Sequence, residues 1–211
     1  MPGKIDSSGD FLRFPGLTLV SHLAGAQALC DMPEVLRSLK HLGKMSPLPP
    51  ASYHVTLLGG PCQYRLGLQD EAWQTFCKEP RWMTAALEAR KEGFAPCFKL
   101  GRVVIGTGYD YLLVELVPLD GTPAHPAEVP LVRRLQEQLG VALERHGWHM
   151  TLAYCPKGQQ TSLASVPSEE LEAERRAVEA ALATCQEVVC HAARLCRFED
   201  MTAFEPWEEQ P

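Results

Sequence analysis

Two short segments of the chain carry a histidine and a threonine two positions apart in an otherwise apolar run. They are SYHVTLLGG at 52–60, with His54 and Thr56, and GWHMTLAYC at 147–155, with His149 and Thr151. Successive side chains of a β-strand point to opposite faces, so each histidine shares a face with its threonine. The apolar neighbours then face the other way, towards packing helices. The pattern predicts two strands, each with one polar and one apolar face.

An imidazole and a hydroxyl on each strand suit acid–base chemistry on a phosphate. The unperturbed pKa of imidazole is about 6.5, so near neutral pH one histidine can be neutral while the other is protonated. The neutral ring can accept a proton from an attacking hydroxyl, and the protonated ring can give one to the leaving oxygen. Hydroxyls of Thr56 and Thr151 can donate hydrogen bonds to the non-bridging phosphate oxygens, where charge builds in the transition state. His54 and His149 are therefore the candidate catalytic pair.

No cofactor is expected at this pair. Few carboxylates adjoin either segment, and neither an H-E-x-x-H motif nor paired aspartates are present, so a metal-dependent hydrolase would lack its ligands. The eight cysteines form no C-x-x-C pair, which favours free buried thiols. A zinc- or thiol-dependent site is an open alternative near the C-terminus, at Cys185, Cys190, His191 and Cys196, although these spacings match no familiar zinc pattern.

The elements around the two motifs repeat in the same order. Each motif strand follows another strand and a helix, and the offset to the histidine is the same from Leu17 as from Leu112. These preceding elements are expected at 16–23 and 26–43 in the first unit, and at 109–119 and 127–139 in the second. One H-x-T-L arises easily by chance, but two at matched offsets indicate an internal duplication with two lobes related by a pseudo-twofold axis.

The remaining segments alternate between helical and strand patterns. Helices are expected at 70–78, 80–92 and 168–185, the last with Ser168 as N-cap, and strands at 97–106 and 187–199. This interleaving predicts an α+β fold with two mostly antiparallel sheets and outer helices around a central cleft. We expect one domain over 1–211, made of two lobes with the motif strands at 53–58 and 148–154.

Composition narrows the possible partners. The chain has 211 residues, of which 45% are apolar and 22% charged, as in an ordinary globular protein. No run of about 18 apolar residues predicts a membrane span. The first residues lack the apolar region of a signal peptide, so a cytoplasmic location is expected. A net charge of −6 argues against binding long duplex nucleic acid but allows a small phosphorylated ligand.

On its two motifs the chain resembles the two-histidine (2H) phosphoesterase superfamily, whose signature is a pair of H-x-[S/T]-x motifs. HVTL at 54–57 and HMTL at 149–152 both fit, and the likeness extends from about Phe14 to Tyr154. That superfamily includes RNA 2′-5′ ligase-like proteins and 2′,3′-cyclic nucleotide phosphodiesterases, and this chain looks most like an uncharacterised branch. The likeness is weaker over the last fifty or so residues.

The resemblance implies a two-lobed fold with His54 and His149 as acid–base partners and Thr56 and Thr151 as phosphate binders. It also implies a metal-independent reaction on a 2′,3′-cyclic phosphate, or on a 2′-5′ or 3′-5′ phosphodiester of a small nucleotide or short RNA. Which histidine is the base is open, because no nearby residue distinguishes them. A nucleotide-binding module without turnover is the alternative function.

Several other residues are weaker candidates for the site. Arg65 follows the first motif by a loop and could reach a phosphate, while Tyr154 and Lys157 could line the rim of the cleft. Tyr53 and Trp148 are expected to pack in the core, and His22 is expected to be structural. Aromatic residues that could stack on a base are Phe14, Tyr64 and Tyr109.

Overall fold

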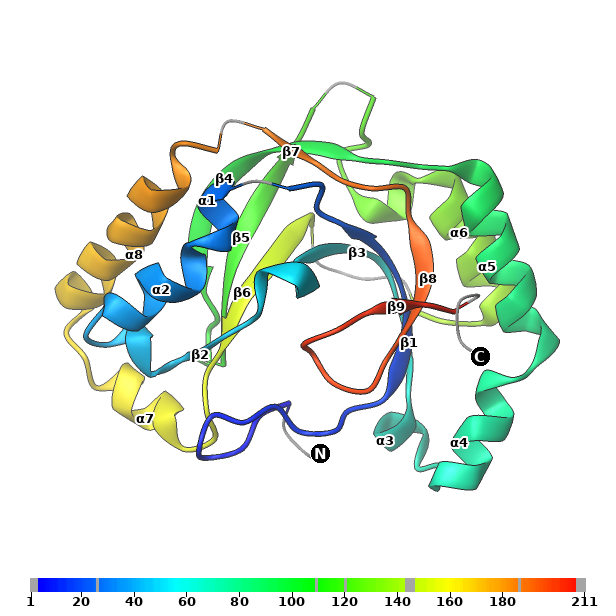
Figure 1. Cartoon of the computed structure of the whole chain (residues 1–211), viewed down its shortest axis with the longest axis horizontal. Helices are drawn as coiled ribbons and strands as arrows, with labels where there is room; N and C mark the ends of the chain where they lie inside the picture. The colour runs from blue at the N-terminus through cyan, green and yellow to red at the C-terminus, as the bar shows by residue number, and fades with distance from the viewer. Residues whose placement is uncertain are drawn as a thin grey trace.

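Two antiparallel sheets form the centre of the fold, and helices cover the outside (Figure 1). The structure is a computed structural model, and it describes residues 4–25, 27–108, 110–119, 121–142, 147–185 and 187–207. The first sheet has the order β3 (His54–Cys62), β1 (Gly16–His22), β8 (Arg194–Phe198), β9 (Glu205–Pro206). The second has the order β2 (Ser46–Pro47), β6 (His149–Tyr154), β5 (Tyr111–Pro118), β4 (Cys97–Ile105), β7 (Val188–Val189). The predicted α+β class with antiparallel sheets is confirmed.

The helices form two outer layers, one over each sheet. They are α1 (Gln27–Cys30), α2 (Met32–Ser38), α3 (Gln63–Leu66), α4 (Asp70–Cys77), α5 (Pro80–Glu92), α6 (Pro130–Leu139), α7 (Gln159–Ala164) and α8 (Ser168–Leu182). Short 3₁₀ helices are η1 (Leu42–Lys44), η2 (Pro50–Ser52) and η3 (Pro126–Glu128). None of the helices described is long and apolar enough to cross a bilayer.

Each strand–helix–strand unit sends its helix across to the other unit's sheet. Helix α2 follows β1 of the first sheet, yet it packs beside α8 and β2 over the second sheet (Figure 1). Helix α6 follows β5 of the second sheet, yet it contacts α5 and β3 over the first. The apolar cover of each sheet therefore comes partly from the other unit, so the two units are interlocked.

Local sequence signals explain where the best-predicted helices begin and end. Helices α5 and α6 begin at Pro80 and Pro130, where a missing backbone N–H costs nothing. They end at Gly93 and Gly140, whose φ angles of 63° and 65° fall in the left-handed region that glycine adopts freely. The apolar face of α6 is fully buried through residues such as Leu135.

Three expectations about secondary structure were wrong. The predicted helix 26–43 is broken, because Pro33 starts a new helix at α2 and the chain turns extended after Ser38. Ser168 is the first residue of α8 and Pro167 is its cap, without a side-chain bond. The predicted strand 187–199 is two strands, because between them the N–H groups of His191 and Ala193 donate to carbonyls of β1 and of the loop before β4.

Candidate active site

The two motif strands contact each other where the two sheets meet, β3 in one sheet and β6 in the other. His54 and Thr56 are partly exposed, whereas Val55 and Leu57 are fully buried. Strand β6 has the same alternation, with His149 and Thr151 partly exposed and their apolar neighbours Met150 and Leu152 buried. Each strand thus has one polar face carrying an imidazole and a hydroxyl, as the sequence predicts.

Both imidazoles are held by the same local bond. Nδ1 of His54 lies 2.7 Å from the carbonyl oxygen of Ser52, and Nδ1 of His149 lies 2.9 Å from that of Gly147. A carbonyl only accepts, so Nδ1 is the donor and carries the hydrogen in both rings. Nε2 is then the atom that accepts a proton when the ring is neutral and gives it back when the ring is charged. Each ring is oriented to exchange protons through Nε2.

The surroundings of His54 change its proton affinity strongly. Burial is the main cause that lowers the pKa of His54 to about 4. The bond to Ser52 opposes this shift, and positive charge on His22, Lys4 or His149 adds to it. His54 is therefore neutral at pH 7, and the contribution of His149 means that the two rings lie within electrostatic range of each other.

Both motif strands carry the same β-bulge just after the threonine. On β3 the pairing with β1 moves from Thr56 directly to Leu58, and on β6 the pairing with β5 moves from Thr151 directly to Ala153. A bulge inserts one residue and redirects the side chains that follow it. Because of this shift, Tyr154 shares the polar face of His149, although a regular strand would place it on the opposite face.

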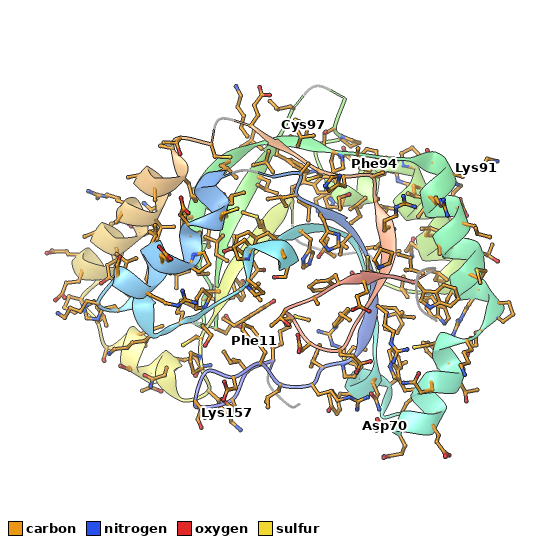
Figure 2. The ribbon with its side chains drawn as sticks, viewed as in Figure 1. Phe11, Asp70, Lys91, Phe94, Cys97 and Lys157 are labelled. Atoms are coloured by element: carbon orange, nitrogen blue, oxygen red, sulfur yellow. The ribbon has the colours of Figure 1, made fainter. Side chains whose placement is uncertain are left out.

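Tyr154 brings a cation to this face. The ammonium of Lys4 donates to the Tyr154 hydroxyl at 2.9 Å and lies 4.6 Å from the centre of its ring. Phe11, from the same N-terminal segment, packs edge-on against that ring, and its side chain is labelled in Figure 2. Nothing in the sequence singles out Lys4, since it belongs to no motif.

A loop from the C-terminal part of the chain covers His54. The connection between β8 and β9 runs towards the second sheet in Figure 1, and its Phe204 ring lies 4.0 Å from the His54 imidazole, centre to centre. Met201 of the same loop accepts a weak hydrogen bond from the Tyr154 hydroxyl at 3.6 Å. The Phe204 ring therefore lies against His54, and no motif in the sequence predicts this contact.

Each catalytic candidate has a different neighbour on the adjacent strand. His22 pairs with His54 across β1 and β3, and their rings are 6.2 Å apart, so His22 lies at the site as a third imidazole. Burial, and then positive charge on His191, lowers the pKa of His22. The partner of His149 across β5 and β6 is Glu115, which binds Arg102 through two nitrogens at 2.7 and 2.9 Å.

Other candidates lie away from the histidine pair. Arg65 is on α3, beyond the far end of β3 and roughly 25 Å along the strand from His54, so it is not brought to the site. Phe14 packs on Tyr64 near that same end, with ring centres 6.1 Å apart. Tyr53 and Trp148 are buried packing residues, as expected. Tyr109 lies outside the described residues.

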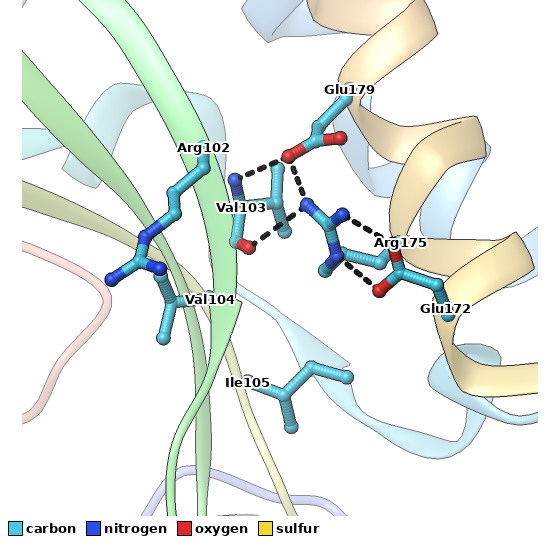
Figure 3. A pocket seen from close by; sticks show the side chains of 7 residues that line it. All are labelled: Arg102, Val103, Val104, Ile105, Glu172, Arg175 and Glu179. Atoms are coloured by element: carbon cyan, nitrogen blue, oxygen red, sulfur yellow. Dashed lines mark hydrogen bonds and ion pairs between the residues drawn. The ribbon is translucent and has the colours of Figure 1, made fainter. Parts of the chain in front are cut away.

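A cavity of about 580 Å³ opens elsewhere, between α8 and β4 (Figure 3). Its charged groups already bind one another, because Arg175 pairs with Glu172 and Glu179. Glu179 also accepts the N–H of Val103 at 2.9 Å, in the irregular part of β4. Figure 3 shows Arg102 on the other side of the strand from Arg175. These contacts fasten the helix to the sheet.

The described residues give the zinc alternative no support. In them, no three or more histidine, cysteine or acidic side chains come close enough to hold a metal ion. Cys190 and Cys196 are buried, and burial raises the pKa of the Cys190 thiol to about 12. A buried thiol with a raised pKa is a poor nucleophile and metal ligand.

Comparison with known proteins agrees with this description. Residues 4–97 match a family model described as "2H-phosphodiest: Domain of unknown function (DUF1868)", a stretch that includes the first motif. The match bears out the resemblance to the two-histidine phosphoesterases over this stretch, which is less than half of the chain. No curated protein matches the sequence.

Solved structures also align with the chain. A conserved protein of unknown function, ATU0111 from Agrobacterium tumefaciens, aligns with a TM-score of 0.58 at 16% identity, over 98% of this chain and 90% of its own. Usb1 from Kluyveromyces marxianus aligns with a TM-score of 0.46 at 16% identity, over 92% of this chain and 98% of its own. The structure of Usb1 from the same organism with uridine monophosphate aligns with a TM-score of 0.45 at 16% identity, over 91% of this chain and 96% of its own. At this identity, the similarity to ATU0111 shows the fold alone.

Proposed function

We propose that this protein is a metal-independent phosphodiesterase acting on a 2′,3′-cyclic phosphate, or on a 2′-5′ or 3′-5′ phosphodiester of a nucleotide or short RNA. The observation that supports it most is the matched presentation of His54 and His149. Both rings donate from Nδ1 to the carbonyl two residues earlier, so in both rings Nε2 is the atom that exchanges a proton. A packing histidine would not require this repeated arrangement.

The lowered pKa of His54 suits it to the role of base, which leaves the role of acid to His149. His54 is neutral at pH 7 because its pKa is lowered to about 4, so its Nε2 accepts the proton of the attacking water. The water oxygen forms a bond to phosphorus as the bond to the leaving oxygen breaks. His149 enters protonated and gives its Nε2 proton to that leaving oxygen. Hydroxyls of Thr56 and Thr151 donate to the non-bridging oxygens, where negative charge increases.

The charge around the site favours a small anionic ligand. The chain as a whole is acidic, with a net charge of −6, so it has little general attraction for long nucleic acid. Lys4 places one cation on the polar face beside Tyr154, whereas Arg102 is already bound by Glu115. We therefore expect a nucleotide or a short oligonucleotide, in a cytoplasmic setting.

The test is hydrolysis of a panel of 2′,3′-cyclic nucleotides and 2′-5′ and 3′-5′ dinucleotides in the presence of EDTA. His54→Gln and His149→Gln should each lower kcat by about 10²–10⁴. His125→Gln is the matched control, because His125 caps η3 and should leave the rate unchanged. Activity that is lost with the chelator, or that survives both substitutions, contradicts the mechanism.

Binding without turnover is the second candidate function. The observation that favours it is the Phe204 ring packed against His54, the proposed base. Tight binding of nucleotides with no product from any member of the panel would support a binding module of the same fold.

A further inference from the structure

Lys4 is held in place by a compact N-terminal turn. The Asp6 carboxylate accepts N–H groups of Ser8, Gly9 and Asp10 at 2.8, 2.9 and 3.0 Å. The turn is tied to the strands of the second sheet, since Lys157 N–H donates to the Asp6 carbonyl and the Ser46 hydroxyl donates to the Gly9 carbonyl. A surface lysine is usually mobile, whereas this one starts from an anchored backbone.

The Lys4 ammonium is a cation without a paired carboxylate in the part of the chain that the structure describes. Its one side-chain hydrogen bond there goes to the neutral Tyr154 hydroxyl, at 2.9 Å. An ammonium has three N–H donors, so two remain for a ligand. Most of the arginines described here are paired with carboxylates instead, for example Arg13, Arg102 and Arg134.

We propose that Lys4 and Tyr154 form a second phosphate-binding site beside the histidine pair, which takes the neighbouring phosphate of the substrate backbone. The inference rests on the proposed function and specifies its substrate class: a nucleotide or short oligonucleotide with a phosphate next to the one that reacts. The ammonium of Lys4 donates to the ligand directly, and the Tyr154 hydroxyl donates to it by turning its O–H away from the weak bond to Met201.

The spacing along β6 separates this site from the reacting phosphate. Thr151 lies opposite Leu113 and Tyr154 lies opposite Tyr111, so the bulge leaves the two residues two strand positions apart, roughly 7 Å along the strand. A phosphate held at Thr151 leaves the Lys4–Tyr154 pair one repeat further along the same face, where we place the neighbouring phosphate of the substrate. The bulge after Thr151 makes this possible, because it turns Tyr154 to the same face. The equivalent position after the bulge on β3 is Gly59, which has no side chain, so the site exists on one side only.

The test measures binding by calorimetry, so it does not depend on turnover. The probes are adenosine 3′-monophosphate and adenosine 3′,5′-bisphosphate, because in the bisphosphate either phosphate can occupy the histidine site while the other reaches Lys4. The wild-type protein should bind the bisphosphate at least about tenfold more tightly. Lys4→Met should abolish that difference, and Tyr154→Phe should reduce it. Lys91→Met, on the remote helix α5 (Figure 2), is the charge-matched control and should preserve it.

The outcomes separate this inference from the proposed function. A preference for the bisphosphate that persists in Lys4→Met overturns the inference, as does an equal weakening of both probes, which would place Lys4 on the reacting phosphate. Failure of the wild type to bind either probe overturns it as well. A Lys4-dependent preference in a protein that hydrolyses nothing supports the second site while refuting the phosphodiesterase.

Discussion

Phe204 packs against His54, and its removal gives a measurable prediction for the pKa of that imidazole. The Phe204 ring lies 4.0 Å from the imidazole, centre to centre, and burial is the largest cause that lowers the pKa of His54 to about 4. The ordinary pKa of a histidine is about 6.5, so for a fully buried ring this shift would correspond to ~3 kcal/mol of added cost for protonating the imidazole. Because the His54 ring is partly exposed, solvent screening reduces that cost to about 2 kcal/mol. Phe204→Ala admits water to one side of the ring. We expect the pKa of His54 to rise by about one unit, or about 1.4 kcal/mol.

The same shift makes stability depend on pH in a defined window. The unfolded chain takes up the His54 proton at about pH 6.5, and the folded chain takes it up only near pH 4. The contribution that the neutral His54 makes to the free energy of unfolding is therefore complete above about pH 6.5, and it is lost as the pH falls from there to about 4. The loss over this window should be smaller in Phe204→Ala.

Proton NMR of the His54 Cε1–H signal, assigned with His54→Gln, measures both pKa values. Phe11→Ala is the matched control, because Phe11 contacts Tyr154 rather than His54. A wild-type pKa at or above about 6.5, or the same pKa with and without Phe204, would refute the reasoning and with it the assignment of His54 as the base.

Three further predictions concern the framework of the site. Gly60→Ala should lower the free energy of unfolding by at least about 2 kcal/mol in urea titrations, because a Cβ would lie 2.1 Å from the Leu17 carbonyl oxygen. Glu174→Ala should lower it by about 1–3 kcal/mol, since its carboxylate accepts the N–H groups of His41 and Leu42; an unchanged midpoint would contradict this. Calorimetry should give one unfolding transition for the whole chain, because each unit's helix covers the other unit's sheet, whereas two transitions would indicate separate domains.

The sequence predicted the parts of the site that depend on local periodicity. The polar and apolar faces of β3 and β6 follow from alternation, and the ends of α5 and α6 follow from Pro and Gly. The repeated motif also identified the two histidines, since one copy alone carries little information.

What the sequence did not predict depends on contacts between distant segments. Nothing local to Tyr154 predicts the bulge that redirects its side chain, because a bulge is defined against the paired strand. His22 lies beside His54 only through the register of β1 and β3. Lys4 and Phe204 reach the site from the two ends of the described chain, and no periodic pattern in the sequence predicts these contacts.

The central claim is that the two imidazoles act on one phosphoryl group. A crystal structure of the protein with a nucleoside 3′-monophosphate tests it most directly. We predict one phosphate with oxygens within about 3.5 Å of Nε2 of both His54 and His149. A phosphate bound elsewhere, or bound by one imidazole while the other ring faces away, would contradict the claim.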